Sequence, residues 1–391
     1  MISTSKSEDT IRKAAIDRSG WSYPVRFFQP HNPACYLYWL LVLKGTYVFC
    51  GLLFRNAIYP TALFIALSSQ ALYCLPWIWF LTHKDRYERE PAKLALLGFL
   101  WGGLVAPWVM ALPGNAAILS LIAKLTSFDF YSHWSPPITA PIVEESAKFV
   151  GLVMLALLAR NHVRNAYDGF LLGAFVGLGF QVFENVSYIV GAPDASFGSQ
   201  QVADALQVLV ARTAVGFWSH SLYTAVAGTG FGYFLEAKNR SFGHRLAVLV
   251  GFFLLACLAH ACWDALGGFI GFGPIGIAIG TVAILLAWRF SERRQRKFVR
   301  VLLADDVANG IVTEAELAAI SNRPRNRRAY LREIKSSSGT DAAKRAGFIL
   351  DAAIDLAAAI ASTDSLDSPA AEAARAEIGR VRGAAQLGRL E

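Results

Sequence analysis

Long apolar runs separated by short polar connections occupy residues 36–290 of this 391-residue chain. Runs of about 17–25 apolar residues are long enough to cross a bilayer as helices. A spanning helix satisfies its backbone hydrogen bonds internally, so the pattern predicts an all-α, polytopic membrane bundle of about eight transmembrane helices. We place the runs at roughly 36–54, 62–81, 94–118, 138–159, 167–190, 206–236, 246–268 and 272–290.

Positive charges gather in alternate connections between these runs. The opposite connections at 191–205 and 269–274 contain no Lys or Arg. Because cations are retained on the cytoplasmic side, this asymmetry predicts that both termini lie in the cytoplasm. The basic connections hold Lys84, Arg86, Arg89, Lys93, Arg160, Arg164, Lys238, Arg240 and Arg245.

The two flanks of the apolar region differ from it in composition. Residues 1–35 are charged and polar without an apolar core, so we expect no cleavable signal peptide and a cytoplasmic N-terminal segment. Residues 291–391 are rich in Ala, Arg, Glu and Asp, and they predict a soluble cytoplasmic tail of short helices. The expected domains are therefore 1–35, a core at 36–290, and a tail at 291–391 that can bind a cytoplasmic partner.

Composition supports the membrane assignment and narrows the partners. The chain is 54% hydrophobic, and its mean hydropathy of +0.39 excludes a soluble globular protein. The net charge of +8 follows the topology, so it indicates attraction to the anionic head groups of the lipid bilayer and no nucleic-acid partner. The five cysteines form no CxxC pair, which indicates packed thiols.

The fourth run carries three charged residues into the membrane: Glu144, Glu145 and Lys148. A charged group at mid-bilayer depth costs about 2.5–3.5 kcal/mol and usually marks function. On a helix Lys148 lies four residues from Glu144 and three from Glu145, so its ammonium can reach either carboxylate. A structural role as ion-pair partner and a catalytic role both remain open for Lys148.

Later runs add polar groups at a similar depth. Glu184 and Tyr188 share one helix face, His220 lies near the middle of its run, and His260 and Asp264 are one turn apart. A single membrane His or Glu is commonly a packing group that hydrogen-bonds to a neighbouring helix. Several acids and imidazoles at one level instead predict a shared hydrated pocket in the outer half of the membrane.

Four blocks of sequence, in order along the chain, carry a family resemblance. Together with the loop Asp85-Arg-Tyr-Glu-Arg-Glu90-Pro91 they resemble the PrsW family of intramembrane proteases, over roughly residues 36–290. That family is distantly related to the CAAX-processing type II membrane proteases, which share the paired glutamates. The blocks are Glu144-Glu145-x-x-Lys148, Phe183-Glu184-x-x-x-Tyr188, His220 followed by Thr224-Ala225, and His260-x-x-Trp263-Asp264.

The resemblance implies an intramembrane endopeptidase of a bacterial cell membrane that cleaves a membrane-anchored protein. From the outer depth of the polar residues we expect cleavage near the extracytoplasmic boundary of the substrate, as in regulatory, site-1-like proteolysis. The expected catalytic residues are Glu144, Glu145, Lys148, Glu184, Tyr188, His220, His260 and Asp264.

Two mechanisms suit these residues. A carboxylate in a low-dielectric cavity is a stronger base, so either Glu144 or Glu145 can activate water. The histidines His220 and His260 with Glu184 can bind a divalent metal such as zinc, leaving one position for water. No HExxH helix is present, and a metal-free glutamate mechanism remains open.

A proton- or ion-coupled transporter is the competing class, because membrane acids and histidines also relay protons. Such a transporter predicts similar segments in the two halves of the chain, and we find no such repeat.

Overall fold

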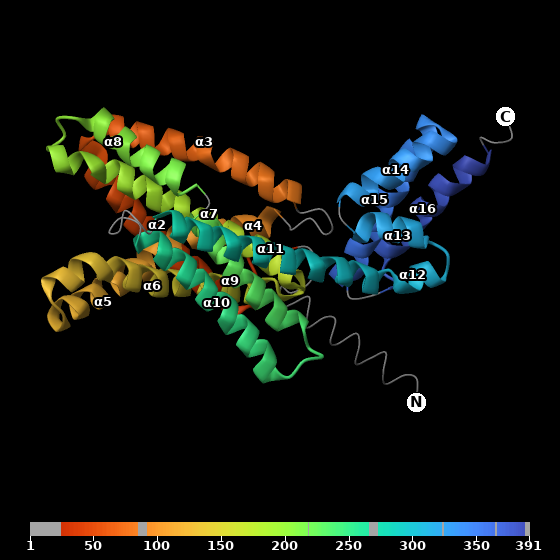
Figure 1. Ribbon diagram of the computed structural model, residues 1–391, viewed down its shortest axis with the longest axis horizontal. Helices are drawn as coiled ribbons and strands as arrows, with labels where there is room; N and C mark the ends of the chain where they lie inside the picture. Colours follow the sequence, from red (N-terminus) through yellow and green to blue (C-terminus); the bar gives the residue numbers. More distant parts are fainter. Residues whose placement is uncertain are drawn as a thin grey trace. The chain divides into compact units, whose positions relative to one another are not determined.

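The computed structural model describes residues 25–84, 92–217, 219–265, 273–322, 324–363 and 366–387, and all of their regular structure is helical (Figure 1). The all-α prediction is therefore confirmed for these residues. The expectations for residues 1–24 and for the loop at 85–91 lie outside them. The chain divides into two compact units, Met1–Lys84 with Glu90–Ser291 and Asp85–Arg89 with Glu292–Glu391.

The first unit consists of long helices joined by short turns. Five of its described helical segments are long and apolar enough to cross a bilayer: Pro33–Ile58, Pro60–His83, Ala92–Leu125, Ala166–Ser196 and Phe242–Asp264. A polytopic helical membrane protein is thus supported, while the count of eight and the inward termini stay predictions. The helices are α2 (Pro33–Arg55), η1 (Asn56–Ile58), α3 (Pro60–Lys84), α4 (Ala92–Leu100), η2 (Trp101–Ala111), α5 (Leu112–Leu125), α6 (Phe128–Leu158), η3 (Arg160–His162), α7 (Ala166–Gly191), η4 (Ala192–Ser196), α8 (Gln201–Val210), η5 (Ala211–Val215), α9 (Ser219–Glu236), α10 (Phe242–Asp264) and α11 (Gly273–Leu302), whose residues after Ser291 belong to the second unit.

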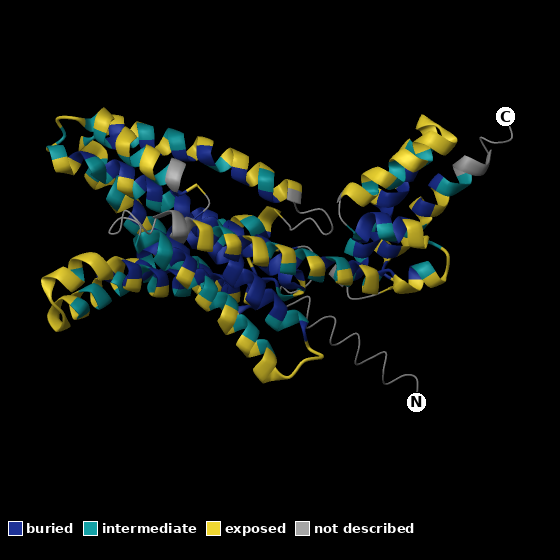
Figure 2. Ribbon diagram, in the orientation of Figure 1, coloured by how far each residue is buried: buried dark blue, intermediate teal, exposed yellow. Residues whose placement is uncertain are grey.

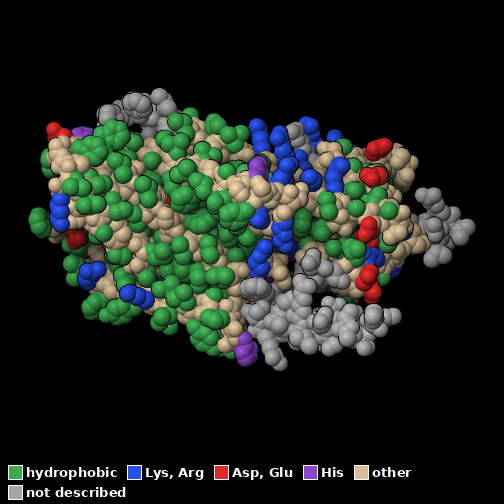
Figure 3. Space-filling model, turned by 90° about the horizontal axis from the view of Figure 1, so that it is seen from below, with side chains coloured by type: hydrophobic (Ala, Val, Ile, Leu, Met, Phe, Trp, Pro, Cys, Tyr) green, Lys and Arg blue, Asp and Glu red, His purple; other side chains and the backbone are tan. Residues whose placement is uncertain are grey.

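The outward surface of this unit is apolar. Figure 2 shows exposed residues along α3 and α10, and Figure 3 shows hydrophobic side chains over much of one face. Apolar surface of this extent does not persist in water and suits contact with lipid. Large exposed side chains include Leu40, Leu43, Tyr47, Phe54, Phe64 and Leu254.

Helix α7 forms the centre of the unit and packs closely against α9. A Cβ atom added to Gly169, Gly173 or Gly177 would lie 2.1–2.3 Å from a carbonyl oxygen of α9. Only glycine allows two backbones to approach so closely, as the four-residue spacing of these residues predicts. The carbonyl facing Gly177 belongs to His220, so this packing fixes the height of a candidate site residue on α9.

The π-helical segment η2 supports the helix that carries the paired glutamates. Its Trp101 is buried, and the indole Nε1 donates a hydrogen bond to the Ala147 carbonyl at 3.1 Å. Gly151 on α6 leaves room for the same ring, because a Cβ there would lie 2.3 Å from it. These contacts hold α6 on both sides of Lys148.

The second unit has a hydrophobic core of its own, in which Leu350, Leu356 and Ile360 are buried. Helix α13 starts with a capping box, in which Thr313 and Glu316 satisfy each other's backbone N–H groups. The described residues of this unit are helical, although the helix Thr340–Thr363, with 24 residues, is longer than the short helices that we expected. They are α12 (Ala304–Ala308), α13 (Glu314–Ser321), α14 (Pro324–Ser338), α15 (Thr340–Thr363) and α16 (Pro369–Leu387).

Candidate active site

The paired glutamates and the lysine of α6 point into the core of the first unit. Glu145 and Lys148 are fully buried, and Glu144 is 5% exposed. Lys148 Nζ donates to Glu145 Oε1 at 2.7 Å and lies 3.8 Å from Glu144 Oε2. Helical spacing alone predicted that this ammonium could reach both acids. Thr224 of α9 donates to the second oxygen of Glu145 at 3.2 Å, so both oxygens of Glu145 are engaged.

Two imidazoles from different helices meet beside these acids. The rings of His220 on α9 and His260 on α10 have centroids 4.8 Å apart. One nitrogen of each ring faces a carboxylate: His260 Nδ1 lies 3.0 Å from Glu145 Oε1, and His220 Nε2 lies 3.0 Å from Glu184 Oε2. Carboxylates at these positions fix the ring orientation and the tautomer of a histidine.

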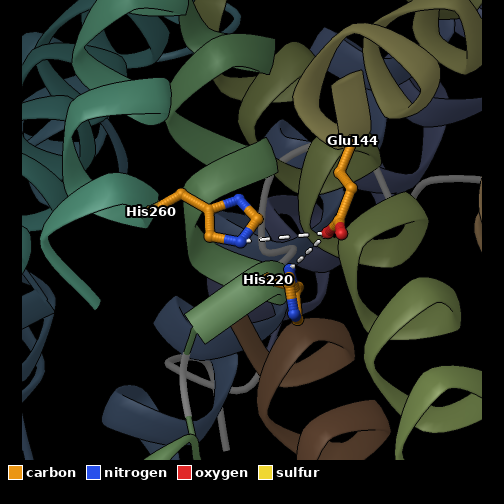
Figure 4. A group of neighbouring side chains, drawn as sticks. All are labelled: Glu144, His220 and His260. Atoms are coloured by element: carbon orange, nitrogen blue, oxygen red, sulfur yellow. Dashed lines mark ion pairs between the residues drawn. The ribbon is translucent and has the colours of Figure 1, made fainter. Parts of the chain in front are cut away.

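The other nitrogen of each imidazole faces Glu144 (Figure 4). Glu144 Oε2 lies 3.8 Å from His260 Nε2 and 4.0 Å from His220 Nδ1. This oxygen is buried, and none of the described residues donates a hydrogen bond to it. Glu144, His220 and His260 therefore form a buried Glu–His–His group whose ligand atoms all lie within 4.8 Å of one another.

This group fits a divalent metal ion. Two histidines and one carboxylate are a common donor set of catalytic zinc. The two separations between Glu144 and the imidazoles, 3.8 and 4.0 Å, exceed those around a tetrahedral ion by about half an ångström. A cation between the three groups would also satisfy the unpartnered oxygen of Glu144. Lys148 Nζ lies 2.8 Å from His220 Nδ1, so the ammonium and a metal would compete for that nitrogen.

The acid in this group differs from the one expected from the sequence. We expected Glu184 with His220 and His260, whereas the structure places Glu144 between the two rings. Glu184, on α7, instead contacts Nε2 of His220, the nitrogen that faces away from Glu144, and pairs with Arg212. The sequence gives the depth of each acid in the membrane but not the rotation of its helix, and rotation decides which acid lies between the rings.

Asp264 and Tyr188 lie at the margin of the site. Asp264 Oδ2 lies 3.5 Å from His260 Nε2, and it has no hydrogen-bond partner among the described residues. Glu145 lies closer to His260 than Asp264 does, and it contacts the opposite nitrogen. Tyr188 shares a helix face with Glu184, and its half-exposed ring packs against the Arg212 guanidinium, 4.4 Å from the ring centroid.

Two further residues of the site were missed by the sequence reasoning. Arg212 pairs with Glu184, and its position within the sixth apolar run was a signal that we did not use. Asn115 on α5 donates from Nδ2 to Glu144 Oε1 at 3.3 Å. No pattern in the sequence marks Asn115, because an uncharged amide next to Pro113 and Gly114 is typical of a helix interruption.

Comparison with known proteins agrees with this chemistry. A family model described as PrsW family intramembrane metalloprotease matches residues 90–289, which include all of the candidate site. Protease PrsW of Geobacillus kaustophilus is 28% identical over 183 residues, covering 46% of this chain and 70% of the relative. Protease PrsW of Clostridioides difficile is 26% identical over 189 residues, covering 48% and 72%. No solved structure matches the chain. These matches favour the protease over the transporter.

Proposed function

Because this chain belongs to the PrsW family of intramembrane metalloproteases, we propose that it cleaves a membrane-anchored protein at the pocket where Glu144, His220 and His260 meet. The observation that carries this proposal is the unpartnered oxygen of Glu144, which faces one nitrogen of each imidazole. A buried carboxylate oxygen that accepts no hydrogen bond is costly, so such an arrangement is typical of a site that binds something further.

Glu144, His220 and His260 would hold the divalent metal ion, for which zinc is our first candidate. Such an ion supplies Lewis-acid chemistry for the hydrolysis of an amide. Of the two adjacent glutamates, Glu144 offers a free oxygen, so we assign Glu144 to the reacting centre. Both oxygens of Glu145 are bound, which assigns Glu145 to the orientation of His260.

Peptide hydrolysis also requires a group that stabilises the developing oxyanion. Lys148 is the cation closest to the reacting centre among the described residues, with Nζ 3.8 Å from Glu144 Oε2. We assign the oxyanion contact to Lys148, whose side chain is held by Glu145 and lies 3.9 Å from the Phe180 ring centroid.

The substrate that we propose is a protein with a single membrane span, cut near its extracytoplasmic boundary. The proposal rests on the basic connections of the sequence, from which the site lies in the outer half of the membrane. Cleavage there would release the external part of the substrate, which is the first step of regulatory, site-1-like proteolysis.

The test is cleavage of a single-span protein with a different tag at each end, by the full chain purified in detergent. Glu144→Gln and His260→Ala are expected to abolish cleavage and metal content together. Asp129→Asn changes an exposed acid at the start of the same helix, α6, and should leave both unchanged.

Two results would contradict the proposal. If Glu144→Gln and His260→Ala are folded and still cleave the substrate, these residues do not form the reacting centre. If the fragments show a cut on the cytoplasmic side of the substrate's span, the proposed cleavage position is wrong.

A further inference from the structure

Arg212 is a cation in the first unit that lies outside the four sequence blocks. It lies in the π-helical turn η5, between α8 and α9, and its side chain is 21% exposed. The Nη2 atom contacts Glu184 Oε2 in a charge-assisted hydrogen bond, the stronger kind of such bonds. Glu184 uses the same oxygen to contact His220 Nε2 at 3.0 Å.

A continuous line of contacts thus connects Arg212 to the reacting centre. Arg212 binds Glu184, Glu184 binds the Nε2 side of His220, and the Nδ1 side of that ring faces Glu144. Glu184 has no other described cation as close as Arg212. Without the guanidinium, a carboxylate that is mostly buried would lose the charge that holds it in place.

The guanidinium itself is held in a fixed orientation. Its Nε donates to Asn185 Oδ1 at 2.9 Å, and Asn185 donates to Gln70 Oε1 of α3 at 3.1 Å. The ring of Tyr188 covers one face of the guanidinium. A planar group held by an amide, a ring and a carboxylate has little freedom to rotate.

We infer that Arg212 is a positioning residue for the protease. It holds Glu184 on the Nε2 side of His220, so that the imidazole keeps its proton on Nε2 and presents Nδ1 to the centre. The inference rests on the proposed function, since His220 is taken to be a ligand. It predicts that Arg212 acts on the centre only through Glu184.

The first test measures Zn²⁺ affinity of the full chain in detergent for the parent, Arg212→Met, Glu184→Gln and the double variant. Loss of a residue that orients a metal ligand lowers affinity by about 10–100-fold. We expect the Zn²⁺ affinity of Arg212→Met and of Glu184→Gln to be lower than that of the parent by a factor in this range. The affinity of the double variant should equal that of Glu184→Gln. Arg212→Lys, which keeps the charge but loses the planar fork, should recover part of the affinity.

A matched control separates this role from general stability. Arg164 pairs with the buried Asp168 at 3.5 Å, at the opposite end of α7. Arg164→Met removes a comparable ion pair and is expected to leave Zn²⁺ affinity unchanged. A Zn²⁺ affinity in Arg212→Met equal to that of the parent would overturn the inference. So would a double variant whose loss of affinity equals the product of the two single losses, because the two residues would then act independently.

A second measurement does not depend on metal or on cleavage. In protein with ¹⁵N-labelled histidine, the resonances of His220, assigned with His220→Gln, report which ring nitrogen carries the proton. We expect the Nε2–H tautomer in the parent and its loss in Arg212→Met. An unchanged tautomer in Arg212→Met overturns the inference. If the parent shows the tautomer but binds no metal, the proposed function fails while the positioning role stands.

Discussion

Glu144 and Glu145 are neighbours in the chain, yet they meet different surroundings. Glu145 is bound at both oxygens by Lys148, His260 and Thr224. Glu144 has one free oxygen, and its other oxygen accepts from Asn115. The sequence predicted that both acids belong to one site, because charged groups in a membrane helix need partners. It could not separate their roles, since each role depends on which neighbouring helix the side chain faces.

Asn115→Ala tests whether the Asn115 amide holds Glu144 toward the imidazoles. Loss of the amide frees Glu144 to turn away from the imidazoles, so we expect cleavage and Zn²⁺ affinity to fall by about 10-fold with the protein still folded. Ser120→Ala changes an exposed residue of the same helix, α5, and serves as the control. Wild-type affinity in Asn115→Ala, measured by Zn²⁺ titration, would show that Glu144 needs no such support.

The close packing of helices α7 and α9 positions His220. The four-residue spacing of glycines in α7 is typical of a close helix contact, but such spacing does not identify the partner helix, which the structure shows to be α9. The π-helical segment η2 lies in an apolar run whose sequence does not show what the segment supports. Its supporting role arises because Trp101 and Gly151 come from distant parts of the chain, which local patterns do not connect.

Gly177→Ala tests the closeness of this contact. The added Cβ would lie 2.2 Å from the His220 carbonyl, so α9 must move. Overpacking of this kind costs about 1–3 kcal/mol, and we expect both stability and cleavage to fall. Gly191→Ala, at the end of the same helix, has open space around it and should change neither. Equal thermal unfolding and cleavage for the two variants would argue against α9 as a rigid support.

The molecule as a whole combines an apolar helical unit with a second unit that has its own core. From composition and run length we predict that the first unit lies in the membrane and the second in the cytoplasm. The basic residues of alternate connections predict on which side of the membrane each connection lies.

Reporter fusions would establish the orientation. A reporter after Glu391 and one inserted at 238–240 are expected to be active on the cytoplasmic side, and one inserted at 197–200 on the opposite side. The two internal insertions control for each other, since both interrupt short connections. The reverse pattern would place the site in the inner half of the membrane and move the proposed cut to the cytoplasmic boundary.

The acids and imidazoles of the site come from four helices: α6, α7, α9 and α10. Its last imidazole, His260, lies on α10, after most of the first unit has been synthesised. A nascent chain that has been inserted only as far as α9 therefore lacks a complete centre. With the centre that we propose, hydrolytic capacity would arise late in biogenesis, after the surrounding helices are in place, and immature chains in the translocation machinery would have no means of cutting their neighbours.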